Sequence, residues 1–199
     1  TPDGAVYYDR TLRILADVED IESSFHDEER GPRGRLRIDV PVSIGRLILI
    51  PRLREFHNRY PDIDLVIGMN DRPVDLVGEA VDCAIRVGEL QDSSLIARRI
   101  GTFQCATAAS ACYLEKYGEP KTLEDLQKNH QAIHFFSSRT GRNFDWDFVV
   151  DDLIQSVSVN GQVSVNDGDA YIDLALQGFG LIQGPRYMLT NHFEAGTLK

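Results

Sequence analysis

Residues 34–71 read GRLRIDVPVSIGRLILIPRLREFHNRYPDIDLVIGMND, and this stretch decides the fold. Apolar and polar side chains alternate over 36–42, which predicts a strand with one buried face. Apolar residues then recur at helical spacing over 44–60, with Pro51 placed to kink the helix, and alternation returns over 63–69. A strand, a helix and a second strand in this order predict a parallel β-α-β unit.

The pattern continues into the next thirty residues. A short helix is predicted over 74–80, and a third strand over 83–87, closed by Gly88. Residues 95–108 then have extended character, with Gly101 near their middle. This segment is long enough to cross from one subdomain to another.

The second half of the chain repeats the alternation of helices and strands. The elements predicted there are helices at 110–117 and 123–128 (capped by Thr122), strands at 132–136, 144–149 and 155–165, a helix from 166 to 176, a strand at 181–185 and a helix from Tyr187. Asn160-Gly161 predicts a hairpin turn inside the third of these strands. The sequence therefore predicts two α/β subdomains that meet near 101–103 and again near 185–188.

The first thirty residues differ from the rest in charge and in period. They carry nine acidic and three basic residues, a net charge of −6 out of −10 for the whole chain. Heptad spacing predicts a long amphipathic helix whose apolar stripe consists of Tyr7, Thr11, Ile14, Val18, Ile21 and Phe25. The stripe packs either on its own domain or on a second chain, and three heptads without Pro or Gly favour the second chain. Gly31-Pro32-Arg33-Gly34 ends the helix.

Composition excludes several classes of protein. The chain has 199 residues, 42% hydrophobic, which is enough to bury a sizeable core. A net charge of −10 argues against direct binding of these residues to the phosphate backbone of a nucleic acid. The apolar runs are too short to span a membrane, and no secretion signal opens the sequence. Three cysteines without C-x-x-C spacing suit a reducing cytoplasm. His130 and His134 are four apart, but the strand position of His134 disfavours a metal site.

Small and hydrogen-bonding residues follow the predicted strands. In open α/β sheets, ligands bind beyond the carboxyl ends of the strands, often at helix N-termini. The candidates for binding a small ligand are Ser43 with the adjoining Ile44, Asn70, Asp71, Gly88, Ser137, Ser138, Asn166, Asp167 and Pro185. The alternative is structural, because Ser43, Asn166 and Asp167 are also good N-cap residues.

Enzyme chemistry finds little support in the sequence. No nucleophile-elbow, zinc-protease, phosphate-loop or dinucleotide-binding motif occurs. Asp145 and Asp147 would share one face of a strand, where a solvated face is the simpler explanation than an acid–base pair. Cys105 and Cys112 offer a redox pair, without surroundings that mark a reactive thiol. We therefore expect no catalytic residue and no cofactor.

Several stretches together resemble the LysR-type transcriptional regulators. Thr1-Pro2-Asp3-Gly4 with Tyr7-Tyr8 resembles the passage of that family into its linker helix, and Gly34-Arg35-Leu36-Arg37-Ile38 resembles the start of its effector domain. Further stretches that resemble the family are 41–51, Phe56, 60–63, the D-L…D-x-x-I-R-x-G segment up to Gly88, and the V-N-D…G-x-G-L-x-x-x-P close over 165–185. The resemblance covers nearly the whole chain.

The resemblance implies a two-lobed, type 2 periplasmic-binding-protein-like α/β domain preceded by a long linker helix. The implied divisions are 1–30 for the linker and dimerisation helix, 33–101 for lobe I, 102–187 for lobe II and 188–199 for the start of a return to lobe I. A small-molecule inducer would bind between the lobes, and analogy with the class suggests a carboxylate. Arg139 and Arg142, next to Ser137-Ser138, are candidates to meet a carboxylate, with a solvated loop arginine as the alternative.

The resemblance also implies partners and a location. The linker helices would build a homodimer or homotetramer in the cytoplasm, without membrane contact. Promoter DNA would be held only by an N-terminal winged helix-turn-helix, which this sequence lacks. The chain ends at Lys199, before the usual return to lobe I, so we expect lobe I to be less stable than in an intact regulator. The competing class is a free-standing solute-binding protein of the same fold, disfavoured by the heptad helix and by the missing secretion signal.

Overall fold

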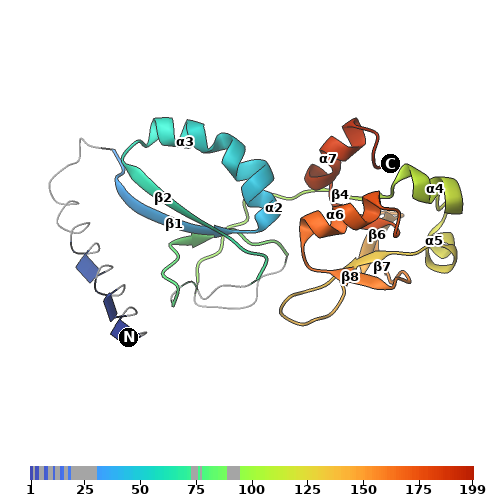
Figure 1. Cartoon of the computed structure of the whole chain (residues 1–199), viewed down its shortest axis with the longest axis horizontal. Helices are drawn as coiled ribbons and strands as arrows, with labels where there is room; N and C mark the ends of the chain where they lie inside the picture. The colour runs from blue at the N-terminus through green and yellow to red at the C-terminus, as the bar shows by residue number, and fades with distance from the viewer. Residues whose placement is uncertain are drawn as a thin grey trace.

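The computed structural model describes residues 1, 3–4, 7–8, 11, 14–15, 18, 31–72, 76, 78–88 and 95–199. Two α/β lobes lie along the long axis of the molecule, with lobe I formed by β1 to β3 and lobe II by β4 to α7 (Figure 1). The extended residues 96–104 connect them. This is the two-subdomain arrangement that the sequence predicts.

Lobe I is built on a parallel sheet of order β2-β1-β3. β1 (Gly34–Val40) pairs with β2 (Ile63–Met69) along its whole length, and β3 (Cys83–Ala84) pairs with the other edge of β1. All pairings are parallel, which confirms the β-α-β unit that residues 34–71 predict. The carboxyl ends of the strands therefore meet at one edge of the sheet.

One continuous helical segment joins β1 to β2 and changes its winding along the way. It consists of α2 (Val42–Ile44), the π-helical η1 (Gly45–Leu49), the 3₁₀-helical η2 (Ile50–Arg52) and α3 (Leu53–Arg59). Pro51 lies in the 3₁₀ turn, where its missing N–H and fixed φ disturb regular α-helix. The predicted helix is confirmed, and its irregular centre coincides with the proline. α3 covers one face of the sheet (Figure 1).

Two details of lobe I differ from the sequence prediction. β3 ends at Ala84, whereas the sequence predicts a strand as far as Val87. Leu76 and residues 78–80 lie in turns, whereas the sequence predicts a helix over 74–80, part of which lies outside the described residues. The physical reason for the turn is at Ala80, whose φ of 48° is left-handed and does not continue a right-handed helix.

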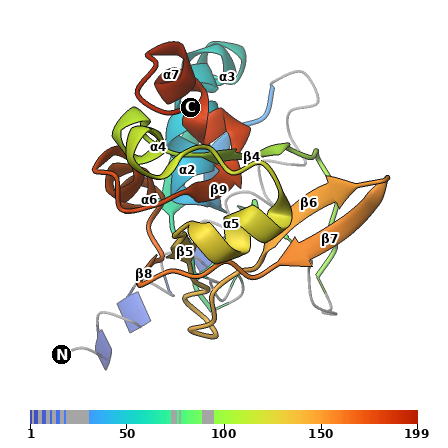
Figure 2. The ribbon, with the colours of Figure 1, turned by 90° about the vertical axis from the view of Figure 1, so that its right-hand side faces the viewer.

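Lobe II contains a mixed sheet and a separate hairpin. β4 (Cys105–Ala108) pairs antiparallel with β9 (Ile182–Pro185), and β5 (Ile133–Phe135) pairs parallel with β8 (Val163–Val165). A bridge between Ala132 and Leu181 connects the two pairs. β6 (Trp146–Val150) and β7 (Leu153–Val157) form the hairpin, which extends away from the helices (Figure 2).

Four helices surround this sheet: α4 (Ala111–Tyr117), α5 (Leu123–Asn129), α6 (Gly168–Leu176) and α7 (Arg186–Glu194). The predicted cap of α5 is confirmed, because Thr122 Oγ1 accepts the N–H of Asp125 at 3.0 Å. Two clusters of buried apolar residues form the core of lobe II, one around Ile133, Ile182 and Leu189 and the other around Trp146. None of the helices that the structure describes is long and apolar enough to cross a membrane.

The last residues of the chain pack in lobe II, whereas the family resemblance implies the start of a return to lobe I over 188–199. Leu189 and Leu198 are almost fully buried in the lobe II core. The backbones of Ala109 and Lys199 exchange two hydrogen bonds, of 2.9 and 3.0 Å. Apolar burial therefore continues past the predicted boundary at Tyr187.

The hairpin of lobe II lies nine residues before the place that the sequence predicts. Asp151 and Asp152 form its turn with φ values of 51° and 62°, which aspartate tolerates better than most residues. Asn160-Gly161 instead forms a close crossing against the strand start at Ala132, whose N–H donates to the carbonyl of Asn160 at 2.7 Å. A β-carbon on Gly161 would lie 2.0 Å from the carbonyl oxygen of Ala132. Glycine is needed at this position for space, not for a hairpin turn.

We predict that Gly161→Ala lowers the free energy of unfolding by about 1–3 kcal/mol, because the added methyl group forces the two backbones apart. Chemical denaturation measures this loss. Gly101→Ala is the matched control, since a β-carbon there would meet nothing within 4 Å. Equal stabilities of the two variants would contradict the crossing at Gly161.

Candidate functional site

The carboxyl edge of the lobe I sheet is organised around the start of α2. Asp71, which follows β2, accepts the N–H of Val42 through Oδ1 at 3.1 Å and so holds the end of β2 against the helix. Ile44 on the same helix is 8% exposed and anchors it to the lobe. Ser43 lies between these two contacts. Its hydroxyl is thereby fixed at the edge that faces lobe II.

A largely buried ion pair between Asp39 and Arg86 stabilises the sheet next to this edge. Asp39, at 3% exposure, accepts a 2.5 Å bond from Arg86 Nη2 and a 2.8 Å bond from Asn70 Nδ2. Arg86 Nη1 also donates to the carbonyl of Ile85 at 2.8 Å. A charged group this buried requires its partners, because removing one leaves an uncompensated charge. The side chain of Asn70 therefore stabilises the buried carboxylate of Asp39 near the end of β1. Gly88, which follows Arg86 by two residues, has a φ of 97°, and a β-carbon there would meet nothing within 4 Å.

The facing edge of lobe II carries the remaining predicted residues. Asp167 caps α6 by accepting the N–H of Ala170 at 2.9 Å, and Asn166 Nδ2 donates to Ser138 Oγ at 3.1 Å. Ser137 closes the adjacent loop, since its carbonyl accepts the N–H of Gly141 at 2.8 Å. Pro185 ends β9 directly before α7. Asp167 is therefore the N-cap that the structural explanation predicts, and it also lies close enough to lobe I for its charge to act on Asp71.

Four side chains outside the predicted set take part in contacts at the junction of the described lobes. Tyr187 OH and Ser43 Oγ share a hydrogen bond of 2.8 Å, and Arg46 Nη1 forms an ion pair with Asp169 Oδ2. Phe103 packs edge-on against Tyr187, with ring centroids 5.5 Å apart. Arg46 is one turn beyond Ser43, and Asp169 and Tyr187 each lie two residues after a predicted site residue. Extending each strand end by one helical turn would have found them.

Charged groups of the two lobes influence one another at this junction. Burial raises the pKa of the Asp71 carboxyl, and the negative charge of Asp167 raises it further, against the opposing N–H of Val42 and the charge of Arg86. Burial likewise raises the pKa of Tyr187, with Asp71 adding to the rise and the bond to Ser43 opposing it. Asp71 and Asp167 come from different lobes and repel each other across the gap.

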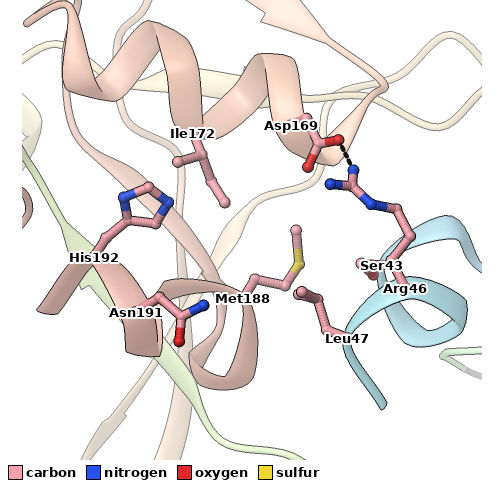
Figure 3. A pocket seen from close by; sticks show the side chains of 8 residues that line it. All are labelled: Ser43, Arg46, Leu47, Asp169, Ile172, Met188, Asn191 and His192. Atoms are coloured by element: carbon pink, nitrogen blue, oxygen red, sulfur yellow. Dashed lines mark hydrogen bonds and ion pairs between the residues drawn. The ribbon is translucent and has the colours of Figure 1, made fainter. Parts of the chain in front are cut away.

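A cavity of about 200 Å³ lies beside these contacts (Figure 3). Its walls come from the helical segment after β1 and from α6 and α7. The lining residues are Ser43, Arg46, Leu47, Asp169, Ile172, Met188, Asn191 and His192. The structure describes all ten predicted site residues, and one of them, Ser43, lines this cavity. Each of the elements in its walls contributes an apolar side chain together with charged or hydrogen-bonding ones, which suits a small polar ligand with a short apolar part.

The cysteines and Asp147 offer little reactive chemistry. Burial raises the pKa of the Cys105 thiol, and the nearby Asp147 raises it further, so that the nucleophilic thiolate is disfavoured. Asp147 Oδ1 accepts a 2.5 Å bond from Ser156 Oγ across the hairpin. Asp147 is exposed on the hairpin, which fits the solvated face that the sequence favours, and the raised pKa of Cys105 disfavours its use as a reactive thiol.

The described residues of the N-terminal stripe are helical. Thr11 Oγ1 donates to the carbonyl of Tyr7 at 2.9 Å, one turn back. Tyr7, Ile14 and Val18 are 75%, 63% and 46% exposed, so lobes I and II leave them uncovered. Ile21 and Phe25 lie outside the described residues.

Comparison with known proteins gives a consistent result. The family model described as "LysR substrate binding domain" matches residues 29–199. The chain is 32% identical over 198 residues to YhjC of Escherichia coli, described as an uncharacterized HTH-type transcriptional regulator, and 35% identical over 201 residues to an HTH-type transcriptional regulator of Xanthomonas campestris. It is covered completely in both matches and spans 66% and 58% of those relatives. The solved structure of CrgA, a LysR-type transcriptional regulator from Neisseria meningitidis, matches with a TM-score of 0.72 and 28% identity over the whole chain and 66% of that chain.

We predict that Asp71→Asn stabilises the chain at neutral pH by less than about 1 kcal/mol. The amide oxygen keeps the bond from Val42, whereas the charge, which burial disfavours first and Asp167 repels in addition, is gone. Because the folded-state pKa of Asp71 is raised, the folded chain binds more protons there than the unfolded chain, and the stability of the parent falls as pH rises from 3.8 through the folded pKa. The advantage of the variant should therefore shrink as pH is lowered toward 3.8, which urea unfolding across this range measures.

Asp82→Asn is the matched control, because Asp82 also accepts a backbone N–H, from Arg37 at 2.7 Å, but precedes β3 at the opposite edge of the sheet. A gain of equal size in both variants would show that neither the burial of Asp71 nor its repulsion by Asp167 is the cause.

Proposed function

The chain belongs to the LysR substrate-binding-domain family, and we propose that it is the effector-sensing part of a transcription regulator, with a small molecule bound between its two lobes. The observation that carries the proposal is the cavity beside Ser43, whose walls come from both lobes. A ligand there contacts η1 of lobe I together with α6 and α7 of lobe II. Its affinity then depends on how the lobes are arranged.

The proposed mechanism is a shift between lobe arrangements. A ligand that binds one arrangement more tightly than another moves the equilibrium by that difference in affinity. Ser43, Arg46 and Asp169 line the cavity and also make contacts between the lobes, Ser43 through its hydrogen bond to Tyr187. The predicted residues Ile44, Asn70, Asp71 and Asp167 support them from the strand ends.

The partners follow from the exposed stripe and the charge. We propose that the N-terminal helix pairs with a second copy, in a homodimer or homotetramer, because its described apolar residues are uncovered. Promoter DNA contacts are proposed for a helix-turn-helix domain outside these 199 residues, since the net charge of −10 disfavours them here. The regulator would act in the cytoplasm.

A free-standing solute-binding protein remains the alternative use of this fold. The relatives reported above are described as transcriptional regulators, which favours regulation. In the cavity wall Ser43 bonds to Tyr187, Asp169 to Arg46 and His192 to Thr197, so these three side chains do not pair with one another as a nucleophile and its base would.

Ligand binding in the cavity is tested by thermal unfolding with a panel of small organic acids, amines and neutral metabolites. We expect at least one compound to stabilise the chain, by about 2.7 kcal/mol at a hundredfold excess over its Kd. Asn191→Trp should abolish this effect, because the exposed Asn191 lines the cavity and a larger side chain fills it. Glu194→Trp, exposed on the same helix outside the cavity, is the control and should bind as the parent does. Binding that survives Asn191→Trp would place the ligand elsewhere.

Pairing through the helix is tested by sedimentation. We expect the chain to self-associate and Ile14→Glu to shift it toward monomer, because a charge on the stripe is costly to bury. Phe144→Glu removes an apolar side chain of similar exposure from lobe II and should leave association unchanged. A parent chain that is monomeric at every concentration would contradict the pairing.

A further inference from the structure

The ion pair between Arg46 and Asp169 lies at the edge of the cavity and joins the two lobes (Figure 3). Arg46 belongs to η1, and Asp169 to the first turn of α6. Both side chains are about half exposed, at 51% and 61%. The arginine therefore presents its guanidinium to solvent and to the cavity while it holds an aspartate of the other lobe.

Another anion can replace Asp169 as the partner of Arg46 at little cost in stability. An exposed ion pair contributes little to stability, because water and salt screen it. Asp169 also lies at the N-terminus of α6, where the helix dipole favours a negative charge, so it keeps a favourable environment when Arg46 leaves. The pair between Arg86 and Asp39 is different, because Asp39 is buried and depends on its partner.

The cavity next to Arg46 matches a small acid. Leu47, Ile172 and Met188 supply an apolar wall for a short carbon chain, and Ser43, Asn191 and His192 supply hydrogen-bonding groups. The contact with Asp169 uses one guanidinium nitrogen, Nη1, whereas a ligand carboxylate can engage two in a fork. Arg139 and Arg142, the arginines that the sequence offers for a carboxylate, are exposed and do not line this cavity.

We propose that Asp169 is a built-in competitor for Arg46: a small carboxylate ligand takes the place of the Asp169 carboxylate on the guanidinium and in doing so breaks an ion pair between the lobes. This inference rests on the proposed function, since it requires that the cavity takes a small molecule. It adds the ligand class and couples binding to the release of lobe II. A neutral ligand of the same shape occupies the cavity without displacing Asp169.

The test compares butyrate with its uncharged isostere butyramide, titrated into the chain and followed by amide chemical shifts of cavity residues. Asp169→Asn should bind butyrate about two- to fivefold more tightly than the parent, because the competitor loses its charge. Its affinity for butyramide should stay unchanged. Arg46→Gln should remove the preference for butyrate over butyramide.

Asp173→Asn is the matched control, because Asp173 is exposed on the same helix one turn further along and is not a lining residue. If Asp169→Asn and Asp173→Asn improve butyrate binding equally, the gain comes from the lower negative charge of the chain in general, and the proposal is wrong. If neither probe binds any variant while a panel compound still binds in the cavity, the ligand class and the role of Asp169 are wrong and the proposed function stands. If nothing binds in either experiment, both fall.

Discussion

The hydrogen bond between Ser43 Oγ and Tyr187 OH is the contact on which the arrangement of the two lobes depends. It is partly buried, and Phe103 from the connecting segment packs on the same tyrosine ring. The elements that pack most closely against one another lie within a single lobe, so side chains rather than a shared core set the junction. One hydrogen bond and one exposed ion pair each contribute about 1 kcal/mol, which a small ligand readily outweighs.

The two lobes differ in how firmly they are built. Both apolar core clusters belong to lobe II, whereas the buried hydrophobic side chains of the described part of lobe I are Val40 and Ile44. Lobe I relies instead on its parallel strand pairing and on the buried pair of Asp39 and Arg86. A polar network of this kind fixes one geometry at the strand ends, which is what a binding edge requires.

Local patterns predicted most elements because they depend on neighbours in sequence. Alternation over 36–42 and helical spacing over 44–60 gave the β-α-β unit, and Thr122 has the capping bond that its position implies. Local spacing could have added Arg46, Asp169 and Tyr187 to the candidates, but it could not say which of them pair, because the contacts join residues 144 and 123 positions apart. The hairpin turn predicted at Asn160-Gly161 is wrong for a similar reason. Glycine is needed there because the backbone carbonyl of Ala132, distant in the sequence, leaves no room for a β-carbon.

The most direct measurement is the distance between the lobes. Spin labels at Arg54 on α3 and Glu115 on α4, both exposed, report it by pulsed electron resonance once Cys83, Cys105 and Cys112 are replaced by serine. We expect one narrow distance in the parent chain and a broad or displaced distribution in the double variant, in which Tyr187→Phe removes the hydrogen bond and Asp169→Asn removes the charge of the ion pair. An unchanged distribution in that double variant would contradict this expectation, because the lobes would then be held by something other than these side chains.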